Sequence, residues 1–222
     1  MPNNQIKCET YCNRAFGCSY YKKGNNYDKY IRNGLSSILD EYKSDSESGN
    51  NSSLFDILSR QYNPRYFAKI VYKEDRKEIE SVFVTCVKNL DDFFFEHEVS
   101  DISGTYLYRG KIRGEIGALA IVKDKEYNVD FSYSDAKETF YNLFYHSFNS
   151  HLYNVCHDKE NDLLVYMLRT DTYYSIKNKS YTIRHGFLEG NIRRRTHRPG
   201  HQCLTCNVKD CMPRLITNIE RI

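Results

Sequence analysis

Residues 114–134 read GEIGALAIVKDKEYNVDFSYS, and this stretch decides the fold that the sequence predicts. Two runs rich in apolar and β-branched residues, 114–122 and 127–134, flank a short polar turn, which is the pattern of a β-hairpin. The run before them, 98–112, also has the composition of strands. We therefore expect residues 98–132 to form one β-meander.

Helices are expected on both sides of this meander, because apolar residues recur there at helical spacing. Ser134 is expected to cap the helix that follows the meander, and Ser53 a short helix before it. The expected helices span 28–42, 54–61, 74–95, 135–150 and 180–195, and two further strands span 163–169 and 172–176. This order predicts an α/β fold, a small mixed sheet flanked by helices, in a single domain over 1–222. The polar segment 43–53, KSDSESGNNSS, is expected to be a flexible loop.

The composition excludes several classes of protein. Charged residues make up 27% of the 222 residues and apolar residues 40%, which is ordinary for a globular domain. No apolar run reaches the roughly 18 residues of a membrane span, so no membrane partner is expected. The first ten residues lack the apolar core of a signal peptide. We therefore expect a cytoplasmic, reducing location in which disulfides are not the default.

Positive charge gathers at the C-terminal end of the chain. Residues 181–222 carry eight Lys or Arg against three Asp or Glu, whereas residues 1–180 carry 24 against 26. Such a basic end on a near-neutral body predicts an anion-binding surface, for which nucleic acid is the natural partner. The alternative is a solvated tail without a partner, and charge alone does not separate the two. Half of the basic residues in this segment are Arg193, Arg194, Arg195 and Arg198.

Six of the eight cysteines lie near the two ends of the chain, three at each end. In a reducing compartment, clustered thiols are typical of metal sites. Cys203, Cys206 and Cys211 offer three thiolates within nine residues, and the spacing of the first two lets both reach one ion. A fourth ligand must come from elsewhere. Zinc and an iron–sulfur cluster both accept four cysteines, so both stay open here. The candidates for the fourth ligand are Cys8, Cys12 and Cys18.

Four other side chains of metal-binding type are expected to be ordinary structural residues. Cys86 and Cys156 lie in apolar or aromatic stretches, where buried packing is the usual role of a thiol. His97 and His146 are expected to be surface or packing residues.

The stretch Cys12-Asn-Arg14-Ala-Phe16 and the cysteine triplet after Pro199 resemble elements of one nuclease group. These are the RecB-like nucleases of the PD-(D/E)xK superfamily that carry an iron–sulfur cluster, such as CRISPR-associated RecB-like exonucleases and exonuclease V. In that group one N-terminal cysteine, in a Cys-Pro-Arg-x-Phe/Tyr stretch, and three C-terminal cysteines hold a [4Fe-4S] cluster. Here Asn13 replaces the Pro. The resemblance implies a PD-(D/E)xK restriction-endonuclease-like core whose two ends are joined at a cluster, with 196–222 as the cluster-binding segment. The implied ligands are Cys12, Cys203, Cys206 and Cys211.

The catalytic positions of that group are mostly lost in this sequence. The resemblance places Ser37 where such nucleases have a His on the first helix, and Gly117 where they have an Asp on the first central strand. On the next strand, Asp130-Phe-Ser132 keeps the acid and loses the Lys of the Asp/Glu-x-Lys motif. Because Mg²⁺ is held by converging carboxylates, a lone Asp130 predicts weak or absent nuclease activity.

A rearranged site is the alternative. Glu115 lies two positions from Gly117 on the same strand face, and Lys137 lies near the start of the following helix. Together with Asp130 they would form a displaced active site that uses Mg²⁺ or Mn²⁺; otherwise Glu115 and Lys137 are plain surface residues. On the same helix, Tyr141 falls near a Tyr that lines the site in active relatives.

Three functions follow from these patterns. The first is a nucleic-acid-binding protein on a RecB-like scaffold with a decayed active site. Its partner would be single-stranded DNA or another nucleic acid, bound through the four arginines, or else a partner nuclease or a CRISPR, repair or viral protein. The second is an active metal-dependent single-strand exonuclease with the rearranged site. The third is a zinc-binding protein-interaction module. The lost catalytic residues favour the first over the second.

Overall fold

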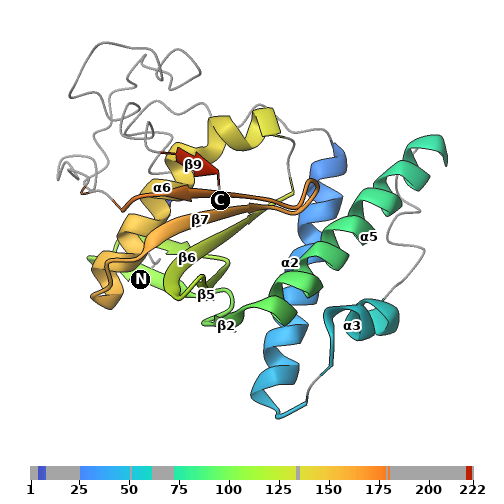
Figure 1. Ribbon diagram of the computed structural model, residues 1–222, viewed down its shortest axis with the longest axis horizontal. Helices are drawn as coiled ribbons and strands as arrows, with labels where there is room; N and C mark the ends of the chain where they lie inside the picture. The colour runs from blue at the N-terminus through green and yellow to red at the C-terminus, as the bar shows by residue number, and fades with distance from the viewer. Residues whose placement is uncertain are drawn as a thin grey trace.

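The computed structural model describes residues 5–8, 26–50, 52–61, 73–133, 136–178, 180 and 219–221. Within these residues the chain forms four helices and two sheets (Figure 1). The helices are α2 (Asn26–Glu47), α3 (Leu54–Gln61), α5 (Lys73–Glu96) and α6 (Ala136–His157). The strands are β1 (Ile6–Lys7), β2 (Glu98–Ser100), β3 (Thr105–Tyr108), β4 (Ile112–Glu115), β5 (Ala118–Val122), β6 (Lys125–Ser132), β7 (Asp162–Met167), β8 (Thr172–Ile176) and β9 (Ile219–Arg221).

The larger sheet is mixed and has the strand order β2-β5-β6-β7-β8-β9. β6 and β7 run parallel, and every other neighbouring pair in this sheet is antiparallel. Parallel neighbours need a crossover connection, and α6 provides it between β6 and β7. The expectation of a mixed sheet flanked by helices is therefore confirmed.

The expected single meander is wrong at one point, because β3 and β4 leave the larger sheet. They pair with each other and with β1 to form a separate three-stranded sheet in the order β1-β4-β3. Two backbone hydrogen bonds close the neck of this excursion: Ser103 N–H donates to Gly117 O and Ile116 N–H to Gly104 O, each at 2.8 Å. Beyond the neck, the hairpin packs against α6 instead of continuing the sheet.

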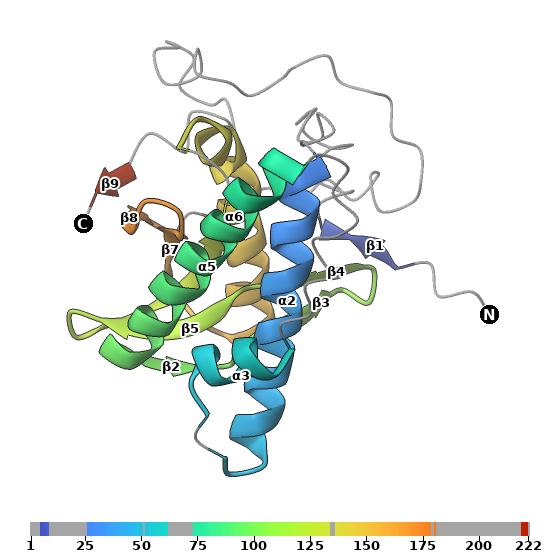
Figure 2. The same cartoon turned by 90° about the vertical axis from the view of Figure 1, so that its right-hand side faces the viewer.

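The two faces of the larger sheet differ in chemistry. Tyr127 and Val129 of β6 belong to the hydrophobic core that is shared with α2, α3 and α5. The alternate residues Asn128 and Asp130 point to the other face, where they bond to side chains of α6. Figure 2 shows α2 and α5 on one side of the strands and α6 on the other. The helix that covers the second face therefore meets a polar stripe of β6.

The helix bounds differ from the expected ones mainly at α2 and α6. α2 begins before Asp28 and continues to Glu47, so the first part of segment 43–53 is helical. The Tyr42 ring packs edge-on against Phe94 of α5, with centroids 5.1 Å apart, which supports the added turn. Ser53 caps the N-terminus of α3 as expected, since the Asp56 N–H donates to Ser53 Oγ at 3.1 Å. None of the described helices is long and apolar enough to span a bilayer.

Candidate functional site

Asp130 on β6 is the centre of the candidate site. The antiparallel pairing of β5 with β6, in which Ala118 faces Val129, brings the backbone of Gly117 next to Asp130. The Gly117 N–H donates to Asp130 Oδ1 at 3.2 Å, and Asp130 Oδ2 lies 2.8 Å from Nδ1 of His146 on α6. A carboxylate oxygen accepts hydrogen bonds, so in this contact the tautomer with its hydrogen on Nδ1 is the donor. Both side chains are largely buried, with 9% of Asp130 and 16% of His146 exposed.

A second carboxylate, Glu115, lies within electrostatic reach of Asp130, and a third, Asp40, lies within reach of Glu115. Glu115 ends β4 with an exposed side chain. Loss of hydration raises its pKa, and the negative charges of Asp40 on α2 and of Asp130 raise it further; Lys43 and Lys7 act in the opposite direction. Negative charge from α2 and β6 thus acts on Glu115 of β4, and Asp130 of β6 also contacts His146 of α6.

The described side chains do not form a metal site. Among the residues that the structure describes, no group of three His, Cys, Asp or Glu side chains could hold a metal ion. Both oxygens of Asp130 already accept hydrogen bonds from the protein. Mg²⁺ is usually held by one or two carboxylates with its remaining waters or substrate oxygens. The structure therefore brings Glu115 and Asp130 within electrostatic reach without making them joint ligands. The side chain of Lys137, the third member of the rearranged site, lies outside the described residues.

Sequence reasoning missed the role of His146, which was expected to be a plain surface or packing residue. One signal was available: His146 lies three residues after Leu143 and four before Ser150, both of them buried, and so falls on the inward face of α6. His97 is a packing residue, as expected. The centroid of its ring lies 4.7 Å from that of Phe93, and burial lowers its pKa.

The two central cysteines, Cys86 and Cys156, differ in burial. Cys86 is fully buried in α5, and burial raises its thiol pKa to about 12, as a packing role requires. Cys156 is exposed near the end of α6, so its expected burial is wrong. The helix extends beyond residue 150, and its last turn leaves the sheet face. Cys8 is buried at the end of β1, where it hydrogen-bonds the Tyr106 hydroxyl.

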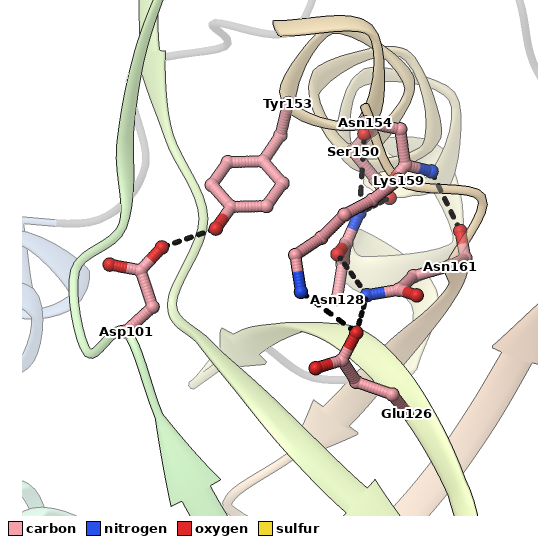
Figure 3. A network of polar contacts seen from close by, with 8 residues as sticks. All are labelled: Asp101, Glu126, Asn128, Ser150, Tyr153, Asn154, Lys159 and Asn161. Carbon is pink, nitrogen blue, oxygen red and sulfur yellow. Dashed lines mark hydrogen bonds and ion pairs between the residues drawn. The ribbon is translucent and has the colours of Figure 1, made fainter. Parts of the chain in front are cut away.

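Beside the Asp130–His146 pair, the interface between α6 and β6 is a buried polar network (Figure 3). Asn128 is fully buried, and its Nδ2 donates to Ser150 Oγ and to Asn154 Oδ1, each at 2.8 Å. Asn161 Nδ2 donates to Asn128 Oδ1 at 3.2 Å and to Glu126 Oε2 at 2.7 Å. Buried amides of this kind stabilise the folded state only when their hydrogen-bonding partners are present. The network therefore fixes the register of α6 on β6.

Two further contacts tie the network to its surroundings. Lys159 Nζ donates to Glu126 Oε2 at 2.9 Å, and this hydrogen bond is the main reason that the Glu126 pKa is lowered. The Tyr153 hydroxyl donates to Oδ2 of Asp101, in the turn that precedes β3 (Figure 3). α6 is thereby held to both sheets, which places His146 on Asp130.

The other predicted site residues lie outside the described residues. This holds for the expected cluster ligands and the expected phosphate-binding arginines, and for the side chain of Tyr141. The residues concerned are Cys12, Cys203, Cys206, Cys211, Arg193, Arg194, Arg195 and Arg198.

Comparisons of the chain with protein-family models, with curated proteins and with solved structures gave no match.

Proposed function

We propose that the protein binds single-stranded nucleic acid on a RecB-like, PD-(D/E)xK-type scaffold whose active site has lost metal-dependent cleavage. The observation that carries this proposal is the state of Asp130, the one acid kept from the family motif. Its carboxylate is engaged by the Gly117 N–H and by His146. In an active relative, Gly117 would be an aspartate and Ser132 a lysine, so the chain has replaced two charged groups around an acid that it keeps.

The placement of the elements supports the same scaffold. The family arrangement calls for a contribution from the first helix, from two neighbouring strands and from the helix that follows them. Asp40 of α2, Gly117 just before β5, Asp130 of β6 and His146 of α6 have these origins. Gly117 and His146 contact the Asp130 carboxylate, and the charges of Asp40 and Asp130 both act on Glu115. A mixed sheet flanked by helices is also what this scaffold requires.

The proposal includes a [4Fe-4S] cluster that would be held by Cys12, Cys203, Cys206 and Cys211 and would join the two ends of the chain. Its role would be structural, because metal binding of this kind is linked to folding. Anaerobically purified protein should then contain iron and absorb near ~400 nm, and Cys206→Ser should lose iron and folded yield together. Stoichiometric zinc without iron would instead favour the zinc-binding interaction module.

A specific observation favours a second candidate, the exonuclease with a rearranged site. Loss of hydration raises the pKa of Glu115, and the negative charges of Asp40 and Asp130 raise it further. Gathered carboxylates are what a divalent cation would neutralise. In this candidate Glu115 and Asp130 bind Mg²⁺ or Mn²⁺, and the ion supplies the charge that polarises a phosphate.

One experiment separates the two candidates. Labelled single-stranded DNA is incubated with the protein and Mg²⁺ or Mn²⁺, and the products are resolved on native and denaturing gels. The proposal predicts a retarded complex in which the strand stays intact. Cleavage that disappears in Asp130→Asn and Glu115→Gln, but persists in a matched exposed variant such as Glu78→Gln, would establish the rearranged nuclease instead.

A further inference from the structure

We propose that β1 is a detachable strap whose release exposes the Cys8 thiol and withdraws the positive charge of Lys7 from Glu115. This device does not depend on which ligand the protein binds, so it goes beyond the proposed function. β1 contributes two paired residues, Ile6 and Lys7, and lies beside β4 at the outer edge of the small sheet (Figure 2). An edge strand this short has few main-chain hydrogen bonds to lose, so side chains must help to hold it in place.

One set of side chains, which we call the latch, fastens the end of β1: Cys8, Tyr106 of β3 and Asn149 of α6. Cys8 is 1% exposed and hydrogen-bonds the Tyr106 hydroxyl. That hydroxyl donates its one hydrogen to Asn149 Oδ1 at 2.7 Å, so the Cys8 thiol is the donor in the first contact. Asn149 Nδ2 then donates to the backbone oxygen of Glu115 at 2.6 Å. A continuous series of hydrogen bonds thus runs from the strap to Glu115.

The latch depends on a glycine in β4. Gly114 is the strand partner of Tyr106. A Cβ at Gly114 would overlap the Tyr106 hydroxyl and would lie 2.7 Å from Asn149 Oδ1. The missing side chain therefore leaves the space that the Tyr106 hydroxyl occupies, where it meets both Cys8 and Asn149.

Docking of the strap also brings a positive charge to the candidate site. The register of β1 on β4 places Lys7 on the same side of the small sheet as Glu115. Loss of hydration and then the charges of Asp40 and Asp130 raise the pKa of Glu115, whereas Lys43 and Lys7 act in the opposite direction. Lys43 belongs to α2 and Lys7 to the strap. Release of β1 therefore removes one of these two favourable charges and makes Glu115 harder to ionise.

The strap is expected to open without unfolding of the core. Local opening costs less free energy than global unfolding where few apolar contacts are lost. Among the described residues, the core that α2, α3 and α5 share with the larger sheet includes Cys86 and leaves out Cys8 and Tyr106. Cys156 is exposed in the folded protein. The three cysteines therefore report three different events: release of β1 at Cys8, unfolding of the core at Cys86, and direct access of a reagent at Cys156.

The test follows alkylation of these three cysteines in the native protein. The protein is incubated with N-ethylmaleimide, samples are quenched over time, and peptide mass spectrometry measures the labelled fraction at each site. Fragment ions distinguish Cys8 from Cys12, with which it shares the tryptic peptide 8–14. We expect Cys156 to react fastest, Cys8 about 100-fold more slowly, and Cys86 about 100-fold more slowly again.

A matched pair of tyrosine variants tests the latch. Tyr106→Phe removes the hydroxyl that bonds Cys8, so it should speed the labelling of Cys8 about fivefold without the same change at Cys86. Tyr108→Phe removes a hydroxyl two residues further along the same strand and should leave the labelling of Cys8 unchanged. A circular-dichroism melt of each variant shows that it is folded.

A matched pair of lysine variants tests the charge. Glu115→Gln is expected to stabilise the protein at pH 7–8, because the raised pKa means that ionisation of Glu115 disfavours folding. That gain in melting temperature should be larger in a Lys7→Gln background, where a charge that favours the ionised carboxylate is gone. In a Lys88→Gln background, which alters an exposed lysine of α5, the gain should equal that in the wild type.

Several outcomes would overturn the strap. If Cys8 stays protected as long as Cys86, β1 is released only when the core unfolds; if Cys8 reacts as fast as Cys156, β1 is not docked. Equal acceleration of Cys8 and Cys86 in Tyr106→Phe would reduce the latch to a loss of global stability. An unchanged gain in the Lys7→Gln background would show that the strap does not act on Glu115. None of these measurements involves nucleic acid, so the proposed function is tested separately.

Discussion

The polar network between α6 and β6 gives the sharpest stability prediction. Asn128→Leu replaces a fully buried amide by an apolar side chain of similar size. The side-chain oxygen Oδ1 of Asn154 then loses the Asn128 donor that lies 2.8 Å away, and the side-chain Nδ2 of Asn161 loses one of its two acceptors. A buried group left without a partner costs about 1–3 kcal/mol. We expect Asn128→Leu to lower the free energy of unfolding by about 2–3 kcal/mol.

The pair of Asn128 and Asn154 then allows a double-mutant cycle. Asn154 is 1% exposed and also donates to the backbone oxygen of Asn161, so Asn154→Leu alone should cost a similar amount. In the double variant both members of the Asn128–Asn154 hydrogen bond are gone, so neither is left without the other, whereas the contacts of both residues with Asn161 are lost as in the single variants. Because removal of both partners of a hydrogen bond is much less harmful than removal of one, the two losses should not add. We expect a coupling energy of about 1–2 kcal/mol.

The assay is urea unfolding at 25 °C followed by far-ultraviolet circular dichroism, with the slope m compared between variants to verify that the unfolded state is unchanged. Asn33→Leu, at an exposed position on α2, is the control and should shift stability by no more than about 0.5 kcal/mol. Strict additivity of the two single variants, within about 0.5 kcal/mol, would refute the reasoning that these amides satisfy each other.

Two other predictions concern the candidate site. Glu115→Gln should raise the melting temperature at pH 7–8: the pKa of Glu115 is raised in the folded state by lost hydration, Asp40 and Asp130, so its ionisation disfavours folding. The gain should disappear as the pH falls below the carboxyl's unfolded value, and a pH series of melts in which the gain grows toward acid would contradict the sign. Gly117→Asp should destabilise the protein and should not create a working nuclease site, because a Cβ at Gly117 would lie 2.7 Å from Cδ2 of Phe131. Overpacking typically costs about 1–3 kcal/mol, and a variant that melts like the wild type and cleaves DNA would disprove this.

The elements with strong local periodicity were predictable from the sequence. α5 was expected over 74–95 and is found at Lys73–Glu96, because apolar residues such as Phe83 and Leu90 recur along one face of it from Ile79 to Phe93. The hairpin of β5 and β6 and the strands β7 and β8 were also found, since each has a run of β-forming residues between turn signals.

The departure of β3 and β4 into a second sheet was not predictable from local pattern. The alternation at Tyr106 and Ile112 shows that one face of each strand is buried. The same alternation is expected whether the two strands continue the larger sheet or pack against α6, so the pattern does not distinguish the two arrangements. The pairing with β1 depends on a segment more than a hundred residues earlier in the chain. Tertiary contacts therefore determine which sheet β3 and β4 join.

The candidate site was predictable only in part. Asp130 was identified from its motif, but its partner His146 was not, because hydrophobic periodicity does not mark a polar inward face. For the same reason the burial of Asn128 and Asn154 was not predicted: polar residues in a strand or a helix are ordinarily expected to face solvent. Glu115 was identified from its place on a strand, and its coupling to Asp40 could be seen only once α2 was placed beside β4.

The central claim is that this scaffold binds a single strand without cutting it. The most direct test is an anisotropy titration of the wild-type protein with a labelled single-stranded oligonucleotide in Mn²⁺, across a salt series, with the same samples then run on a denaturing gel. Binding through phosphate contacts predicts affinity that falls as salt rises, with a negative log–log slope, and a strand of unchanged length. Absence of binding at low salt, or a shortened strand that Asp130→Asn leaves intact, would contradict the account.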